Sequence, residues 1–280
     1  MIILVPVVLA VVLLPCLFLY STCYARKLSD DEIERRLLAA ESAELPTSAG
    51  RKERGEVLRH AQHALEQVSK RLEAGQDISR FRPAILALTR HEEAVMRRTV
   101  VWLMGWDRQN PEFQQAFKRM LGDPDPQVRY NAALRLSAVR EGGMTLARPV
   151  LHAALRPLEV RVTSSGRIRE ALSVGDKVLE GAALARLETS EGGIVSVAAP
   201  LSGRLSGRRA GPGAWLARGD VLCSLLPNSA QVREVMKALY YFGDLADLDA
   251  IRPLARGSEP YGSELQEEAR RVVEAIKTRK

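Results

Sequence analysis

The chain has 280 residues, of which 46% are hydrophobic and 27% are charged, a balance that supports an anchor plus roughly two packed domains. Aromatic residues make up only 5%, so the cores are expected to be aliphatic, and the net charge of +7 bears on non-specific attraction to anions rather than on the fold. The three cysteines, Cys16, Cys23 and Cys223, exclude a disulfide framework and a C-x-x-C metal pair.

Residues 1–24 are predicted to form a transmembrane anchor. The run from Ile2 to Tyr20 contains no charged residue and, with a few flanking residues, is long enough to span the hydrocarbon core of a bilayer. A cleaved signal peptide is the alternative, but no basic residue precedes the run and no A-x-A-like cleavage site follows it. Because Arg26 and Lys27 follow the run, and basic residues stay on the cytoplasmic side, we expect a single-pass protein of the plasma (inner) membrane with a cytoplasmic soluble region.

Residues 25–50 are interpreted as a juxtamembrane helix followed by a linker. Ser29-Asp30-Asp31-Glu32 has the pattern of a capping box at a helix start, and the linker covers residues 45–50. The next apolar residues recur at three- and four-residue spacing up to a stop near Gly75, which predicts a helix. Its His60 and His63 share one face and are interpreted as a surface pair, since no further metal ligand is close in the sequence.

Residues 51–156 keep a helical pattern throughout, and their most specific motif runs from Leu121 to Leu136. A first helix ends at Gly122, an Asp-Pro-Asp-Pro turn follows, and Pro126 suits the first turn of a second helix. This motif resembles a HEAT repeat. The residues that carry the resemblance are Asp123, Asp125, Val128, Arg129, Ala132 and Leu136.

The resemblance to HEAT repeats implies that a turn aspartate, Asp123 or Asp125, pairs with Arg129 to brace adjacent units. Weaker copies of the motif occur at residues 91–98 and within residues 228–280. Stacked helical repeats need neighbours to bury their faces, so several copies are expected if one is present.

Residues 157–227 change to short β-branched runs separated by glycines, which predicts a small β domain. The domain repeats itself: Ser165-Gly166-Arg167-Ile168 is followed later by Ser202-Gly203-Arg204-Leu205. Two such halves are expected to interlock as a barrel-sandwich. The region resembles a biotinyl/lipoyl domain, and also the corresponding domain of membrane-fusion adaptors of the HlyD type.

In carrier members of that family, a hairpin between the halves presents a lysine that receives lipoate or biotin. The corresponding run here is Leu187 to Gly193, in which Glu188 and Thr189 match the family, while Ser190 and Glu191 replace its Asp-Lys pair. Glu191 therefore occupies the approximate position of the carrier lysine. A carboxylate does not form the amide that tethers either cofactor, so we expect no cofactor, no catalytic residues and no metal site. No carboxylate stands in an apolar context that would indicate a raised pKa.

The sequence thus predicts an α+β multidomain protein: a transmembrane helix, HEAT-like helical repeats, and an all-β barrel-sandwich set between helical segments. We expect a non-catalytic scaffold or adaptor with protein partners, held at the membrane by its first helix, and compatible with weak contact to anionic lipid. An adaptor of an export system is the alternative. A basic module that binds lipid or nucleic acid is a weaker one, and it would use Arg161, Arg167, Arg169, Arg204, Arg208 and Arg209.

Overall fold

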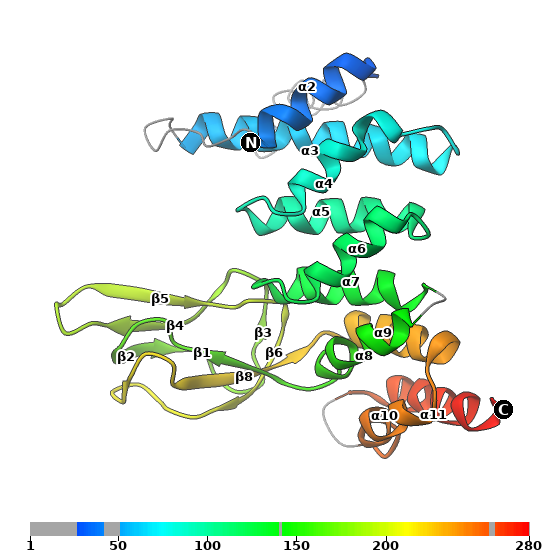
Figure 1. Ribbon diagram of the computed structural model, residues 1–280. Helices are drawn as coiled ribbons and strands as arrows, with labels where there is room; N and C mark the ends of the chain where they lie inside the picture. Colours follow the sequence, from blue (N-terminus) through cyan, green and yellow to red (C-terminus); the bar gives the residue numbers. More distant parts are fainter. Residues whose placement is uncertain (1–26, 42–50, 140–141, 258–260, 280) are drawn as a thin grey trace, which may run out of the picture. The chain divides into compact units, whose positions relative to one another are not determined.

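The computed structural model describes residues 27–41, 51–139, 142–257 and 261–279 (Figure 1). The chain divides into two compact units, Met1–Asp107 and Arg108–Lys280, which are described separately below. None of the helices in the described ranges is both long enough and apolar enough to span a membrane. The predicted anchor over residues 1–24 and the predicted linker over residues 45–50 lie outside these ranges.

The described part of the first unit is helical. Its elements are α2 (Asp30–Glu41), α3 (Arg51–Glu73), η1 (Ser79–Phe81), α4 (Arg82–Leu88), α5 (Ala94–Met104) and η2 (Gly105–Asp107). The Glu32 N–H donates to the Ser29 hydroxyl at 3.3 Å, as the capping-box pattern predicts. Ile33 and Leu37 lie on one face of α2 and are fully buried, and α2 packs against both α3 and α4.

His63 is buried, so the prediction that His60 and His63 form a surface pair is wrong. Its side chain is only 5% exposed, and its ring nitrogens lie 3.3 Å from the Arg36 guanidinium and 3.3 Å from the Gln67 amide. His60 remains exposed. The reason is that α2 packs on the face of α3 that carries His63, which periodicity within α3 alone does not reveal.

In the second unit, helices precede and follow a β region in the sequence. The helices are α6 (Pro111–Met120), α7 (Pro126–Ser137), α8 (Gly143–Ala153), α9 (Ser229–Phe242), η3 (Leu245–Asp247), α10 (Leu248–Ala255) and α11 (Ser263–Thr278). α9 packs against α7, which precedes the β region, and against α11, which follows it. The helical packing therefore continues across the β region.

The β region consists of two four-stranded antiparallel sheets around one aliphatic core. The strands are β1 (Leu158–Arg161), β2 (Gly166–Ala171), β3 (Lys177–Val178), β4 (Ala183–Glu188), β5 (Ile194–Ala198), β6 (Gly203–Arg208), β7 (Trp215–Leu216) and β8 (Val221–Pro227). Their orders are β1-β8-β6-β3 and β5-β4-β2-β7. Helical repeats combined with two antiparallel sheets confirm the α+β prediction.

The two halves of the β region interlock with an internal twofold relationship. Each strand of the first half, β1 to β4, pairs with a strand of the second half, β5 to β8. The turn bonds repeat as well. The Gly175 N–H donates to the Leu205 carbonyl at 2.7 Å, and the equivalent Gly213 N–H donates to the Ile168 carbonyl at 2.7 Å. The repeated glycine pattern in the sequence therefore corresponds to a repeated structure.

The chain enters the β region through β1 and leaves it through β8, and these two strands are adjacent. β1 lies beside β8 (Figure 1), and the two strands pair with Leu158 opposite Leu225. The Tyr130 hydroxyl of α7 donates to the Gln231 carbonyl of α9 at 3.0 Å. The β region is thus an excursion between helices that contact each other directly.

Candidate protein-interaction site

The turn before α7 is built by the residues that the sequence identified. The Asp125 side chain caps the helix by accepting the Val128 N–H at 2.8 Å, and the Asp123 side chain accepts the Asp125 N–H at 2.8 Å. Arg129 donates through Nη1 to the carbonyl oxygens of Asp123, at 2.6 Å, and Pro124, at 3.0 Å. Arg129 therefore fastens the first turn of α7 to the backbone of the preceding turn.

The remaining motif residues serve packing. Val128, Ala132 and Leu136 are fully buried. They lie on one face of α7, at the spacing that a helix needs to bury a continuous stripe. The motif is thus structural, and a partner would have to contact other side chains.

The same arginine arrangement recurs in the first unit at the start of α5. Arg97 donates through Nη1 to the carbonyl oxygens of His91, at 2.7 Å, and Glu92, at 2.8 Å. These acceptors lie six and five residues before the arginine, as they do for Arg129. The predicted weaker copy at residues 91–98 is therefore a geometric copy of the α7 motif, although it lacks the Asp-Pro-Asp-Pro turn.

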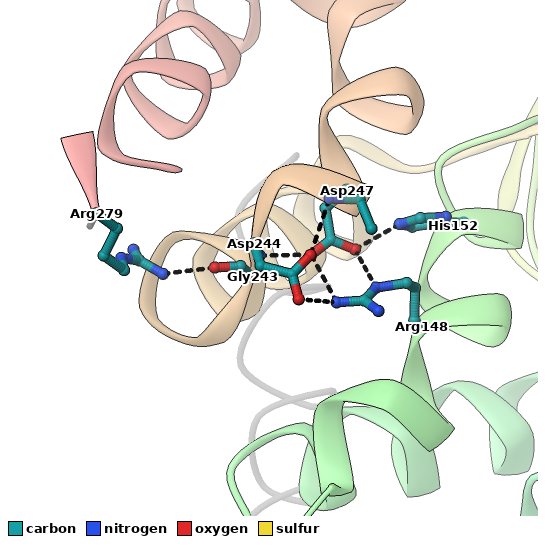
Figure 2. Close-up of polar contacts among 7 residues, drawn as sticks. Arg148, His152, Gly243, Asp244, Asp247 and Arg279 are labelled. Atoms are coloured by element: carbon teal, nitrogen blue, oxygen red, sulfur yellow. Dashed lines mark hydrogen bonds and ion pairs between the residues drawn. The ribbon is translucent and has the colours of Figure 1, made fainter. Parts of the chain in front are cut away.

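A network of charged side chains joins α8 to the turn after α9 (Figure 2). Asp247 is fully buried and accepts from Arg148 Nε at 2.8 Å. The same oxygen lies 2.7 Å from His152 Nε2. Arg148 also donates to Asp244 at 2.6 Å, while the Asp244 N–H donates to Asp247 at 2.8 Å. A buried carboxylate is tolerated because these donors surround it.

The network shifts the pKa of Arg148 and of Asp244. The hydrogen bond to Asp247, opposed by burial, raises the pKa of Arg148 above its ordinary value. Partial burial acts to raise the pKa of the Asp244 carboxyl, but the hydrogen bonds from the Ala246 N–H and Arg148 outweigh it and hold that pKa below its ordinary value. The network therefore links α8 to the C-terminal helices through hydrogen bonds and ion pairs.

The hairpin between β4 and β5 places Glu191 at an exposed tip. β4 ends at Glu188 and β5 begins at Ile194, so the connection covers residues 189–193 alone. The Thr189 N–H donates to the Gly193 carbonyl at 2.9 Å, and Gly192 adopts a φ of 78°. In Figure 1 this tip lies at the end of the β region away from the point where β1 and β8 join the helices.

Exposed aromatic side chains gather at two places on the helices. In the first unit, Trp102 and Trp106 are 45% and 52% exposed and meet edge to face, with ring centroids 6.0 Å apart. In the second unit, Tyr240, Tyr241 and Phe242 end α9 as consecutive exposed rings. Trp and Tyr are enriched among the residues that dominate protein interfaces, so these two clusters are the candidate contact surfaces.

The basic residues named for lipid or nucleic-acid binding do not form one free surface. Arg161 pairs with Glu159 and Arg169 pairs with Glu188, both at 2.6 Å. Arg167 and Arg208 donate to backbone carbonyl groups. Four of the six arginines are therefore engaged within the β region.

Within the described ranges, no group of three or more potential ligands could hold a metal ion. Cys223 lies in β8 and is 1% exposed, and burial raises the pKa of its thiol to about 11. A buried thiol with a raised pKa is a poor nucleophile. Its role is packing in the β core.

Residues 82–170 match the family model for HEAT repeats. The helices within residues 82–170 therefore include HEAT repeats. The match covers the α5 and α7 helices and extends into β1 and β2. The family model and the shared arrangement of Arg97 and Arg129 therefore both support HEAT repeats.

No curated protein matches the chain. One solved structure with similarity is described as "Structure and function of a single-chain, multi-domain long-chain acyl-coa carboxylase", with 22% identity and a TM-score of 0.25. The similarity covers 50% of this chain and 16% of that protein. A likeness this low carries no argument about function.

Sequence reasoning missed the Arg148–Asp247 network and the two aromatic clusters. The network joins residues 99 positions apart, so no local pattern indicates it. A weak signal was present in Asp244 and Asp247, whose spacing is that of a capping box. The run Tyr240-Tyr241-Phe242 stands out in a chain with few aromatics, and it could have been singled out.

Proposed function

We propose that this chain is a non-catalytic, membrane-anchored scaffold that binds protein partners through its HEAT repeats. The observation that carries the proposal is the exposure of aromatic clusters on helices that are otherwise built for stacking. HEAT repeats are generally protein-binding, and Trp102 with Trp106, or Tyr240 to Phe242, present the kind of side chain that anchors interfaces.

We further propose that the β region is a biotinyl/lipoyl-like barrel-sandwich without a carrier lysine. Its internal twofold and its interlocked strands support that reading. The exposed hairpin tip carries Glu191 where carrier members present lysine. The β region then acts as a docking or assembly element and carries no tethered cofactor.

The adaptor of an export system gains no support from the hairpin. Members of that class usually carry a long coiled coil between the two halves, whereas the connection here covers residues 189–193. Membrane attachment with a cytoplasmic soluble region is part of the proposal. Proteolysis of intact spheroplasts should therefore leave the soluble region uncut, and cleavage from outside would contradict the topology.

Site-specific photocrosslinking in cells tests partner binding. A photoreactive amino acid at Trp106 or Tyr241 should give discrete crosslinked bands, whereas the same group at the exposed polar positions Glu66 and Gln115 should not. Replacing Tyr240 and Phe242 by alanine should remove the Tyr241 product. Equal crosslinking at all four positions, or none, would contradict a specific docking role for the aromatic clusters.

A further inference from the structure

A cavity of about 360 Å³ lies where the β region returns to the helices. β3 and β6 contribute Lys177 and Arg204, and the residues at the starts of α9 and α11 contribute Asn228, Ser229, Tyr261 and Gly262. Of the described residues that line it, none carries a carboxylate.

The two cations of the cavity face each other directly. Lys177 in β3 lies opposite Arg204 in β6. Like charges at directly opposed positions of an antiparallel pair are destabilising. Within the described ranges, neither side chain has a hydrogen bond or an ion pair. Among the residues that the structure describes, these two positive charges therefore have no hydrogen-bonded or ion-paired partner.

The internal twofold provides a comparison within the same molecule. The position equivalent to Arg204 is Arg167, which lies opposite Trp215 on one side and Glu188 on the other. Arg204 instead lies opposite Lys177 and Leu226. In one half of the β region, Glu188 balances the charge of Arg167. In the half that faces the helices, Leu226 takes the place of that glutamate, and Lys177 adds a second positive charge.

Two helix starts add to the positive potential of the cavity. Asn228 is the N-cap of α9, which has 14 residues, and Gly262 is the N-cap of α11, which has 16. Gly262 offers no side chain to satisfy the first N–H groups of α11. Glu264 in that first turn is paired with Arg233 at 2.9 Å. Helix N-termini favour anions through their free N–H groups and their dipole.

Tyr261 fixes the wall between the β region and α11. Its hydroxyl donates to the Pro227 carbonyl at 3.1 Å, and burial raises its pKa to about 12, so the phenol stays protonated. Gly203 fixes the opposite wall, because a Cβ there would lie 2.2 Å from the Leu226 carbonyl oxygen. The cavity is therefore bounded by backbone held in place on both sides.

We propose that this cavity binds a phosphate group, with Lys177 and Arg204 as its cationic ligands and the α9 and α11 starts as backbone donors. A phosphate monoester carries close to two negative charges at neutral pH and several acceptor oxygens, which match two facing cations. The phosphate belongs either to a soluble phosphate ester or to a lipid headgroup. The proposal does not depend on the scaffold role.

The test uses the full chain in detergent or nanodiscs and measures thermal melting and calorimetric binding with inorganic phosphate. Chloride at matched ionic strength is the reference. K177Q/R204Q is the variant, and R209Q/R218Q is the control, because it removes the same charge from exposed positions that do not line the cavity. To identify the source of the phosphate, binding of glycerol 3-phosphate is compared with binding to vesicles that contain phosphatidic acid. Vesicles of phosphatidylcholine alone serve as the reference.

We expect a saturable rise of Tm with phosphate that chloride does not reproduce. K177Q/R204Q should weaken binding at least about tenfold, and R209Q/R218Q should leave it within about twofold. In the absence of phosphate, K177Q/R204Q should melt at or above the Tm of the natural chain, because the like-charge pair is gone. This result also shows that the variant folds.

Binding to phosphatidic acid vesicles alone would support the site with a lipid source, and binding to glycerol 3-phosphate would support a soluble source. No saturable response to phosphate, glycerol 3-phosphate or phosphatidic acid would overturn the proposal. Equal weakening by both double variants would also overturn it, because it would indicate a general charge effect.

Discussion

Tyr130 in α7 donates a hydrogen bond of 3.0 Å to the carbonyl oxygen of Gln231 in α9, 101 residues later in the chain. The β region lies between these two residues in the sequence. The bond therefore joins the helix that precedes the β region to the helix that follows it. Burial raises the pKa of Tyr130 well above its ordinary value, so its hydroxyl stays a donor at all physiological pH values. The helical packing is therefore continuous in space although it is interrupted in sequence.

Tyr130→Phe removes this bond and keeps the ring. The free energy of unfolding should fall by about 1 kcal/mol, the usual net value of one such bond. Urea denaturation measures the change. Tyr240→Phe is the matched control, because Tyr240 is exposed, and its effect should stay within about 0.5 kcal/mol. Equal effects of the two substitutions would show that α7 and α9 are not joined through Tyr130.

The two arginines of the repeated motif should contribute alike. Arg97→Met and Arg129→Met each remove two hydrogen bonds from a guanidinium to carbonyl groups, and each should cost about 2 kcal/mol. Arg119→Met, at an exposed position of α6, should cost little. Chemical denaturation of each single variant measures these losses. A negligible effect of Arg97→Met would contradict the equivalence of the two copies.

The Arg148–Asp247 network should be sensitive to removal of one partner. Asp247→Asn should cost about 3 kcal/mol, because Arg148 would keep its charge without its buried counter-ion. Chemical denaturation at pH 7 measures this loss. The exposed ion pair of Arg252 and Asp249 provides the control, and Asp249→Asn should change the stability by less than about 0.5 kcal/mol.

Acid should weaken the same network through Asp244. Its pKa is lower in the folded protein than its ordinary value of 3.8, so the unfolded chain binds the proton more tightly. The contribution of this carboxylate is present above pH 3.8 and is lost as the pH falls through the folded pKa. The free energy of unfolding of Asp244→Asn should therefore fall less steeply below pH 4 than that of the natural chain. Parallel curves would refute the coupling.

The two twofold-related glycines of the β region should not tolerate a side chain. A Cβ would lie 2.2 Å from the Leu226 carbonyl oxygen at Gly203 and 2.7 Å from the Glu188 carbonyl oxygen at Gly166. Gly203→Ala and Gly166→Ala should each cost about 1–3 kcal/mol, with the larger loss at Gly203. Thermal melting measures both. Gly207→Ala in β6 meets nothing within 4 Å and should be close to neutral; a similar loss there would point to strand flexibility as the cause.

The fold followed from the sequence where the determinants are local. The Ser29 cap, the α7 turn and the glycine repeat of the β region each depend on residues a few positions apart, and the structure has them as predicted. Burial of His63 and Asp247 depends on helices that pack from elsewhere in the chain, so no local pattern revealed it. The aromatic clusters show why exposure is hard to infer, because an aromatic run in a helix is compatible with either a core or a surface.

The pairing of β1 with β8 has a consequence for the order of folding. Leu158 pairs with Leu225, and the strand that holds Leu225 leads directly into α9, which packs against α7. Closing so long a segment adds little to the free-energy cost, about 0.6 kcal/mol for each doubling of its length, but contacts distant in sequence form slowly. We therefore expect α6 to α8 to gain protection against hydrogen exchange early, the β region next, and α9 to α11 last. During synthesis, we expect the C-terminal helices to pack only after β1 and β8 have paired.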